Sequence, residues 1–167
     1  MWNFSKRVLK SFLLRNHVRL TRTYTGPRLA RLLEDLRPLE TEHELIRIGG
    51  DGDGGYLIPN DLEGVDACFS PGVSTVADFE FDLVERGIPC FMADYSVDSP
   101  PFAHPLFDFE KKFLGSADDS VFTRLDTWVD RKGSRFNDLI LQMDIEGAGY
   151  EVVIGADLDL LRKFRIL

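Results

Sequence analysis

Carboxylates and small polar residues follow three apolar segments of this 167-residue chain. The turn Ser70-Pro71-Gly72-Val73-Ser74 lets backbone N–H groups approach a ligand, and a helix start behind it favours negative charge. Asp94 lies 22 residues after Gly72, close to the spacing of ~20 in nucleoside-binding units whose acid binds ribose hydroxyls. Asp144 and Glu146 are two carboxylates that can orient or deprotonate a hydroxyl. Plain turns and helix caps produce the same patterns, so a ligand-binding site and a purely structural role both stay open.

A Gly/Asp-rich loop at 49–55 joins two short apolar runs, which predicts a hairpin. It begins like a calcium loop, but Leu62 stands where such a loop needs its last glutamate. Asp51 and Asp53 also form the Asp-x-Asp pattern with which some sugar-nucleotide transferases hold a divalent metal. A nucleotide-sugar-dependent glycosyltransferase is therefore an alternative function. The other interpretations are a plain turn that needs glycine torsions and a loop in which Asp53 borders a cofactor pocket.

Other catalytic chemistries have little support in the sequence. There is no Gly-x-Ser-x-Gly motif, and the three histidines are not beside a nucleophile motif, so a triad hydrolase is not expected. Cys68 and Cys90 lie in apolar runs without a Cys-x-x-Cys motif, which indicates reduced thiols in a cytoplasmic protein. No stretch approaches the ~20 apolar residues that a membrane-spanning helix requires.

Charge is unevenly distributed along the chain. Residues 1–33 carry +8 and residues 34–167 carry −16, which gives the net charge of −8. The acidic body argues against nucleic-acid binding, because phosphates attract basic surfaces. The basic arm is either a solvated leading helix or an amphipathic helix that contacts an anionic membrane or a protein partner. A membrane-peripheral location therefore stays open beside the cytoplasmic one.

Residues 1–43 are predicted to form a basic helical N-terminal extension. Pro27 suits the first turn of a helix, leucines then recur on one face, and Pro38 stops the helix. In residues 44–167, strands alternate with helices, which predicts an α/β domain with a parallel sheet covered on both faces.

The boundaries of the expected elements follow from apolar runs and punctuating residues. Thr75 and Asp78 are spaced like an N-terminal capping pair, and Gly87 suits the left-handed residue after a helix. Strands are expected at 65–69, 88–93, 121–125, 139–143 and 164–167. Helices are expected at 75–86, 107–113, 126–131 and within 149–164.

Two segments together carry a resemblance to a known family. Leu125-Asp126-Thr127-Trp128-Val129 precedes an apolar run that ends in Asp144-Ile145-Glu146-Gly147-Ala148. In this order, the pair resembles the FkbM-type family of S-adenosylmethionine-dependent methyltransferases, and residues 53–59 look like one subgroup of it. The resemblance covers residues 45–167. It implies a Rossmann-like class I methyltransferase sheet with S-adenosylmethionine as cofactor.

The resemblance also implies roles for individual residues. Asp94 would bind the ribose of the cofactor, and Asp118 or Asp119 would contact the amino group of its adenine. Asp144 and Glu146 would border the acceptor site, where one of them orients or deprotonates a hydroxyl. The methionine portion and the rim of the cofactor pocket would be lined by Ser70, Gly72, Val73 and Asp53.

The predicted reaction is O-methyl transfer to a sugar or another small hydroxylated acceptor. The cofactor supplies an electrophilic methyl group, so the enzyme must align the acceptor and help to remove a proton. Gly149 stands where the family motif has Glu, and the family's domains continue through a fifth strand and an antiparallel pair. We therefore expect a domain that is incomplete at its C-terminus, which a partner or an oligomer would complete. A non-catalytic fragment is the remaining alternative.

Overall fold

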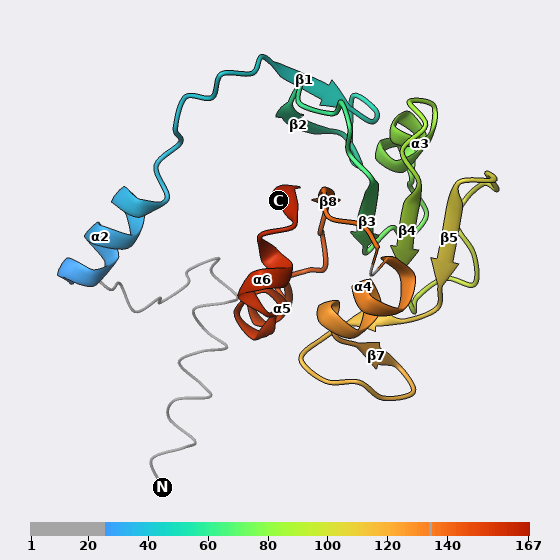
Figure 1. Cartoon of the computed structure of the whole chain (residues 1–167). Coiled ribbons are helices and arrows are strands. Elements are labelled where there is room, and N and C mark those ends of the chain that lie inside the picture. Colours follow the sequence, from blue (N-terminus) through green and yellow to red (C-terminus); the bar gives the residue numbers. More distant parts are fainter. Residues whose placement is uncertain (1–25, 134) are drawn as a thin grey trace, which may run out of the picture. The chain divides into compact units, whose positions relative to one another are not determined.

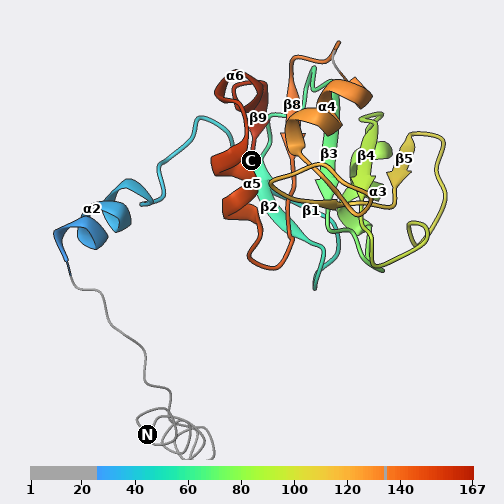
Figure 2. The same ribbon diagram turned by 90° about the horizontal axis from the view of Figure 1, so that it is seen from below.

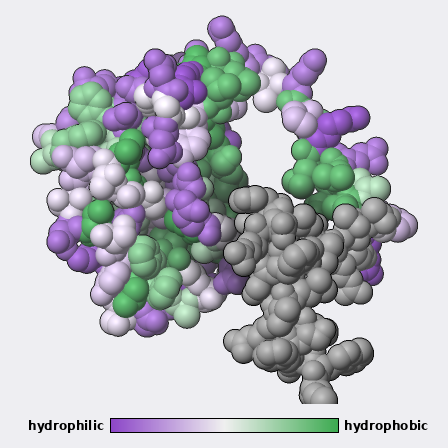
Figure 3. Space-filling model, turned by 180° about the vertical axis from the view of Figure 1, so that it is seen from behind, coloured by the Kyte–Doolittle hydropathy of each residue, from purple (hydrophilic) through white to green (hydrophobic). Residues whose placement is uncertain are grey.

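The chain divides into two compact units, residues 1–40 and residues 41–167. The computed structural model describes residues 26–133 and 135–167, so the expected leading helix of the basic arm lies outside the described residues. In the first unit, helix α2 (Pro27–Asp35) begins at Pro27 as predicted, because proline has no N–H to leave unpaired in the first turn. Helix α2 buries none of its residues, and its exposed leucines appear as hydrophobic surface in Figure 3.

The second unit is an α/β domain built on a five-stranded sheet (Figure 1). The strands lie in the order β5-β4-β3-β8-β9, and every neighbouring pair is parallel. Their bounds are β3 (Ala67–Pro71), β4 (Cys90–Ala93), β5 (Phe107–Glu110), β8 (Leu139–Leu141) and β9 (Phe164–Ile166). The predicted alternation of strands and helices and the predicted parallel sheet are thus confirmed.

Helices cover both faces of this sheet. Side chains of the central strand β3 point alternately to either side, so both faces of the sheet need a covering layer. Phe69 packs edge-on against Trp128 at a ring distance of 5.0 Å, in the layer of α4 (Leu125–Gly133), α5 (Gly149–Gly155) and α6 (Leu158–Leu161). Cys68 faces the opposite layer, where α3 (Asp78–Val84) packs through Phe79 and Leu83. Figure 2 shows α3 and α4 on opposite sides of the strands.

Two small sheets complete the domain. Strands β1 (Leu45–Ile48) and β2 (Tyr56–Pro59) form the predicted hairpin, and Ile48 and Ile58 join the core beside α3. Strands β6 (Phe113–Leu114) and β7 (Phe122–Thr123) form a parallel pair of their own. The strand expected at 121–125 is therefore shorter than predicted, and it does not join the main sheet.

The short helix expected at 107–113 is wrong, because this segment contains the edge strand β5. Its residues alternate with the period of two that a strand requires. Phe107 and Phe109 pack beside Met92, on the α3 side of the sheet. On the other side, Asp108 pairs with Lys132 of α4 at 2.7 Å, and Glu110 pairs with Arg131 of α4 at the same distance.

The expected capping pair at Thr75 and Asp78 is also wrong. Helix α3 begins later than predicted, at Asp78, and Ala77 is its N-cap without a capping side chain. A tight turn precedes it, in which the Val76 N–H donates to the Val73 carbonyl at 3.2 Å. After the helix, Gly87 has the left-handed φ of +81° that was predicted. Among the residues described, no helix has both the length and the apolar composition needed to span a membrane.

Candidate functional site

A cavity of about 590 Å³ lies at the carboxyl ends of β3, β4 and β8. Ligands of open parallel sheets bind at this edge, and the volume is within the usual range for small-molecule sites. The hairpin contributes Asp53 and Tyr56 to the lining, and the β6–β7 pair contributes an apolar wall with Phe113 and Phe122. Elements far apart in the sequence therefore meet around one cavity.

Gly72 lets the turn after β3 approach the end of β8 closely. This glycine has a φ of +92°, and its N–H donates to the Ala93 carbonyl at 2.9 Å. A Cβ at this position would lie 2.2 Å from the backbone oxygen of Asp144. Only glycine combines this backbone torsion with so close an approach. Gly72 therefore permits two strand ends to meet on one side of the cavity.

Asp94 follows β4 and organises the same turn. Its carboxylate accepts hydrogen bonds from Ser74 N at 2.8 Å, from Ser96 N at 2.7 Å and from Ser96 Oγ at 2.6 Å. Asp94 is buried, with 4% of its surface exposed, yet it lines the cavity. Both of its oxygens thus have donors within the protein. Oδ1 accepts two of the three bonds, and Oδ2 accepts one and retains a lone pair for a ligand hydroxyl.

Asp144 follows β8 and contacts the hairpin β1–β2 at the cavity. The Tyr56 hydroxyl donates to Asp144 Oδ2 at 3.0 Å. Burial raises the pKa of Tyr56 to about 12, and the nearby carboxylates of Asp144 and Asp53 add to this shift. The Tyr56 hydroxyl therefore stays protonated at neutral pH and acts as a hydrogen-bond donor.

Backbone strain is found at this cavity. Ser74 and Glu146 are the two non-glycine residues with positive φ in the described part of the chain, at +50° and +52°, and both line the cavity. Left-handed torsions cost a residue with a Cβ of order 1–2 kcal/mol. Such strain is often concentrated where a site fixes side chains in one arrangement.

A buried polar cluster lies between the ends of β3 and β8. Ser70 Oγ is within hydrogen-bond distance of Glu80 Oε1 and lies 2.7 Å from Gln142 Oε1. The hydroxyl has one proton, so one contact is donated by its partner, either a protonated Glu80 carboxyl or the Gln142 amide turned to present its N–H. Burial raises the pKa of Glu80, which favours the protonated carboxyl.

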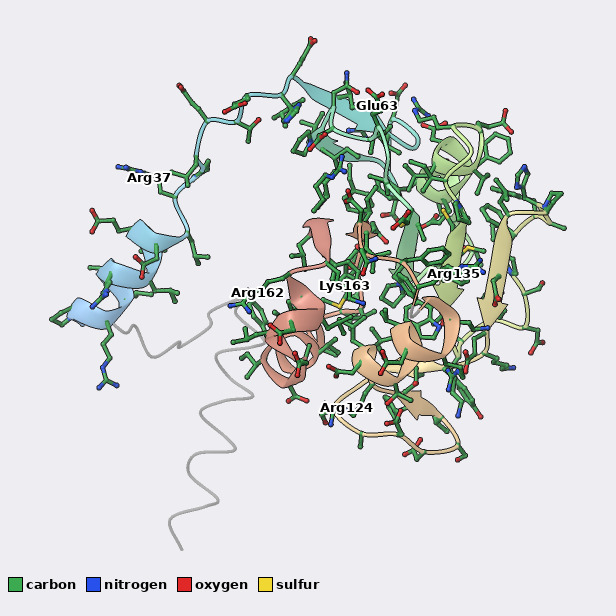
Figure 4. All side chains as sticks on the ribbon, in the orientation of Figure 1. Arg37, Glu63, Arg124, Arg135, Arg162 and Lys163 are labelled. Carbon is green, nitrogen blue, oxygen red and sulfur yellow. The ribbon has the colours of Figure 1, made fainter. Side chains whose placement is uncertain are left out.

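The lining of the cavity is strongly acidic. Within residues 26–133 and 135–167, it contains no Lys, Arg or His. Basic side chains such as Arg124 and Lys163 lie instead beside α4 and α6 (Figure 4). Five carboxyl side chains line the cavity: Asp53, Glu80, Asp94, Asp144 and Glu146.

Most of the residues singled out in the sequence come together here. Ser70 lies beneath the cavity, fully buried against Glu80, and is not part of the lining. The predicted residues that do line the cavity are Asp53, Gly72, Val73, Asp94, Asp144 and Glu146.

Asp118 and Asp119 are not part of the lining. The Asp118 carboxylate accepts from Arg124 N at 2.9 Å and from Thr127 Oγ1 at 2.8 Å, at the start of α4. Asp119 accepts from Val121 N and Phe122 N, both at 2.7 Å. These bonds lower the pKa of both carboxyls, with the backbone N–H donors making the largest contribution. Both residues shape the connection between β6 and α4.

Of Asp51 and Asp53, only Asp53 lines the cavity. Asp51 is exposed near Arg47, whereas the Asp53 carboxylate accepts from Gly54 N at 3.1 Å and lines the cavity. Over the described residues, no group of three or more His, Cys, Asp or Glu residues is arranged to hold a metal ion.

The sequence did not predict Tyr56, Glu80 and Gln142 as residues of the site. Glu80 had a signal, because it lies three residues before Leu83 and four before Val84, on the buried side of α3. Tyr56 and Gln142 had none, since their importance depends on contacts between distant segments. Comparisons of this chain with protein-family models, curated proteins and solved structures found no match.

Proposed function

We propose that this chain is an S-adenosylmethionine-dependent methyltransferase of the FkbM type, which methylates a hydroxyl oxygen of a sugar or another small hydroxylated molecule. The parallel sheet with helices on both faces is compatible with the Rossmann-like sheet of class I methyltransferases. The cavity lies at the edge of the sheet where such folds bind nucleosides.

The acidic lining is the observation that carries this proposal. A diphosphate, as in nucleotide sugars and dinucleotides, is normally bound by basic side chains, a metal ion or a helix N-terminus. The cofactor proposed here instead carries a positive sulfonium, which a carboxylate-rich cavity favours. Asp51 does not line the cavity, which weakens the support for a nucleotide-sugar glycosyltransferase that holds a metal ion with both aspartates.

The residues present fit this cofactor. Gly72 leaves room for close approach at the turn after β3, where Val73 also lines the cavity. Asp94 offers the remaining lone pair of Oδ2 to a ribose hydroxyl. When bound, the cofactor supplies an electrophilic methyl group. Asp144 and Glu146 lie at the end of a different strand, where a carboxylate can hold the acceptor hydroxyl and take its proton.

The proposal includes a reducing, cytoplasmic location. Cys68 and Cys90 are free thiols that face each other as register partners on β3 and β4. Both are fully buried, and burial raises the pKa of Cys68 well above its ordinary value, so this thiol stays protonated and unreactive.

Calorimetric titration with S-adenosylhomocysteine tests the proposal. We expect saturable binding by the wild type and binding weakened about tenfold in Asp94→Asn, which keeps the size of the side chain but loses its charge. Asp130→Asn is the matched control, because Asp130 is exposed on α4 and does not line the cavity. A folded wild type that binds UDP-glucose with Mn²⁺, or binds neither compound, would overturn the proposal.

A further inference from the structure

The hairpin β1–β2 is fixed to the domain beside the cavity. The Tyr56 ring packs edge-on against Phe79 of α3, with ring centroids 5.7 Å apart. The N–H of Gly49 donates to Asp82 Oδ2 at 2.8 Å. These contacts, together with the buried Ile48 and Ile58, hold the hairpin against α3. Tyr56 thus has a fixed position from which its hydroxyl reaches the end of β8.

The hydrogen bond from Tyr56 to Asp144 joins residues 88 positions apart in the sequence. It fixes Asp144 Oδ2, and Oδ1 has no donor among residues 26–133 and 135–167. Asp144 is otherwise exposed, and it lines the cavity at the end of β8. The carboxylate is therefore oriented by one oxygen and open to a ligand at the other.

We infer that the hairpin completes the acceptor side of the cavity, where Tyr56 positions the Asp144 carboxylate to receive the hydroxyl of a neutral or cationic acceptor. This inference rests on the proposed function. Tyr56 is a positioning residue, since it acts through Asp144. Asp53 and Glu146 also line the cavity, and their charges disfavour a phosphorylated or carboxylated acceptor.

The chemical step balances with these groups. The acceptor oxygen forms a bond to the methyl carbon, and the carbon–sulfur bond breaks with its electron pair left on sulfur. The hydroxyl proton passes to the open oxygen of Asp144 and then to solvent. The positive charge of the sulfonium is lost as the proton is released, so charge is conserved.

The test compares two ligands by calorimetry, S-adenosylhomocysteine and sinefungin, which carries a primary amine where the cofactor carries its methylsulfonium group. The amine is protonated at neutral pH and points to the acceptor side, so it probes the carboxylate without a known acceptor. We expect the wild type to bind sinefungin about tenfold more tightly than S-adenosylhomocysteine. We expect Asp144→Asn to remove most of this difference and Tyr56→Phe to reduce it about threefold.

Both variants are expected to keep the affinity for S-adenosylhomocysteine within about twofold, because neither group is placed on the cofactor side. Tyr56→Phe keeps the ring that packs on Phe79 and removes only the hydroxyl. Tyr150→Phe is the matched control, since the Tyr150 ring is 80% exposed on α5 and does not line the cavity.

The outcomes separate the two proposals. If the folded wild type does not bind S-adenosylhomocysteine, the proposed function fails. If it binds, but prefers sinefungin no more than S-adenosylhomocysteine, the acceptor side is not where we place it. If Tyr56→Phe leaves the preference unchanged, or weakens both ligands equally, the positioning role of Tyr56 is wrong while the proposed function stands.

Discussion

The carboxyl ends of β4 and β8 each present an aspartate to the same cavity, but the two carboxylates are held differently. Asp94 is buried and accepts three hydrogen bonds from Ser74 and Ser96. Asp144 is exposed and accepts one, from Tyr56. Asp94 uses three of its hydrogen-bonding positions on the loop around it and keeps one at Oδ2, whereas Oδ1 of Asp144 has no donor among the described residues. The two strand ends therefore differ in how much of the carboxylate stays open to a ligand or a proton.

The largest expected effect is that of Gly72→Ala, which tests whether the strand ends must meet. The new Cβ would lie 2.2 Å from the Asp144 backbone oxygen, at a φ of +92°. Torsional strain and the forced backbone shift together should lower the free energy of unfolding by about 4 kcal/mol in urea denaturation. Gly64→Ala is the control, because Gly64 has a similar φ of +78° and open space around it. Equal losses in both variants would mean that the close approach of the ends of β3 and β8 does not depend on Gly72.

The second-largest expected effect is the difference in stability between variants of the two aspartates. Asp94→Ala leaves the N–H groups of Ser74 and Ser96 without their acceptor, and should cost about 3 kcal/mol of unfolding free energy. Asp144→Ala removes one exposed hydrogen bond and should cost less than about 1 kcal/mol. Thermal and urea unfolding of both variants measure this difference. Similar costs for the two substitutions would show that the two carboxylates contribute equally to stability.

The buried Glu80 of α3 contacts Ser70 at the end of β3, and the prediction for this residue concerns the pH dependence of stability. Burial raises its pKa above the ordinary value of 4.5, so folding favours the protonated carboxyl. The stability from this group is complete below pH 4.5 and is lost as pH rises through the folded-state pKa. Glu80→Gln should therefore gain stability relative to the wild type as pH rises from 4.5 to 8.

Urea denaturation across this pH range measures the effect. Glu85→Gln is the control for the loss of a carboxyl group from this helix, because Glu85 is exposed at the end of α3. A constant difference between Glu80→Gln and the wild type would show that Glu80 has the same protonation in the folded and unfolded chains.

The smallest expected effect concerns backbone strain in the loops that follow β3 and β8. Ser74 and Glu146 have positive φ, at the turn after β3 and in the loop after β8 respectively. Replacing either with glycine removes the Cβ conflict but adds freedom to the unfolded chain, so each should gain about 0.5 kcal/mol. Differential scanning calorimetry would detect the higher midpoints. A loss of stability in Ser74→Gly alone would show that its side chain stabilises the Asp94 loop.

The sequence predicted what depends on local pattern. The order of elements, the hairpin and the acids at strand ends follow from apolar runs and the residues that punctuate them. The segment at 107–113 misled the prediction because phenylalanines also occur on helices, and its ion pairs with Lys132 and Arg131 of α4 were not visible in the pattern. Asp118 was predicted to contact adenine, although its carboxylate accepts hydrogen bonds from Arg124 N and Thr127 Oγ1 at the start of α4.

The geometry of the site could not be predicted in the same way. Tyr56 and Asp144 meet because the hairpin folds over α3, and that packing depends on Phe79 and Asp82. Such contacts are set by tertiary structure, which single-sequence patterns do not encode. The strand-end rule nevertheless predicts that Gly72, Asp94 and Asp144 lie at one edge of the sheet, and all three line the cavity.

The parallel pairing of β3 with β8 also has a consequence for folding kinetics. Ser70 and Gln142 touch across this pair although 72 residues separate them in the sequence. Closing so long a loop precedes any gain from the contact, so chains dominated by such pairings fold slowly. The cavity requires β3, β4 and β8 to be in register, and its binding capacity should therefore be gained late in refolding. A ligand that binds only the completed cavity would act on the unfolding rate and leave the folding rate unchanged.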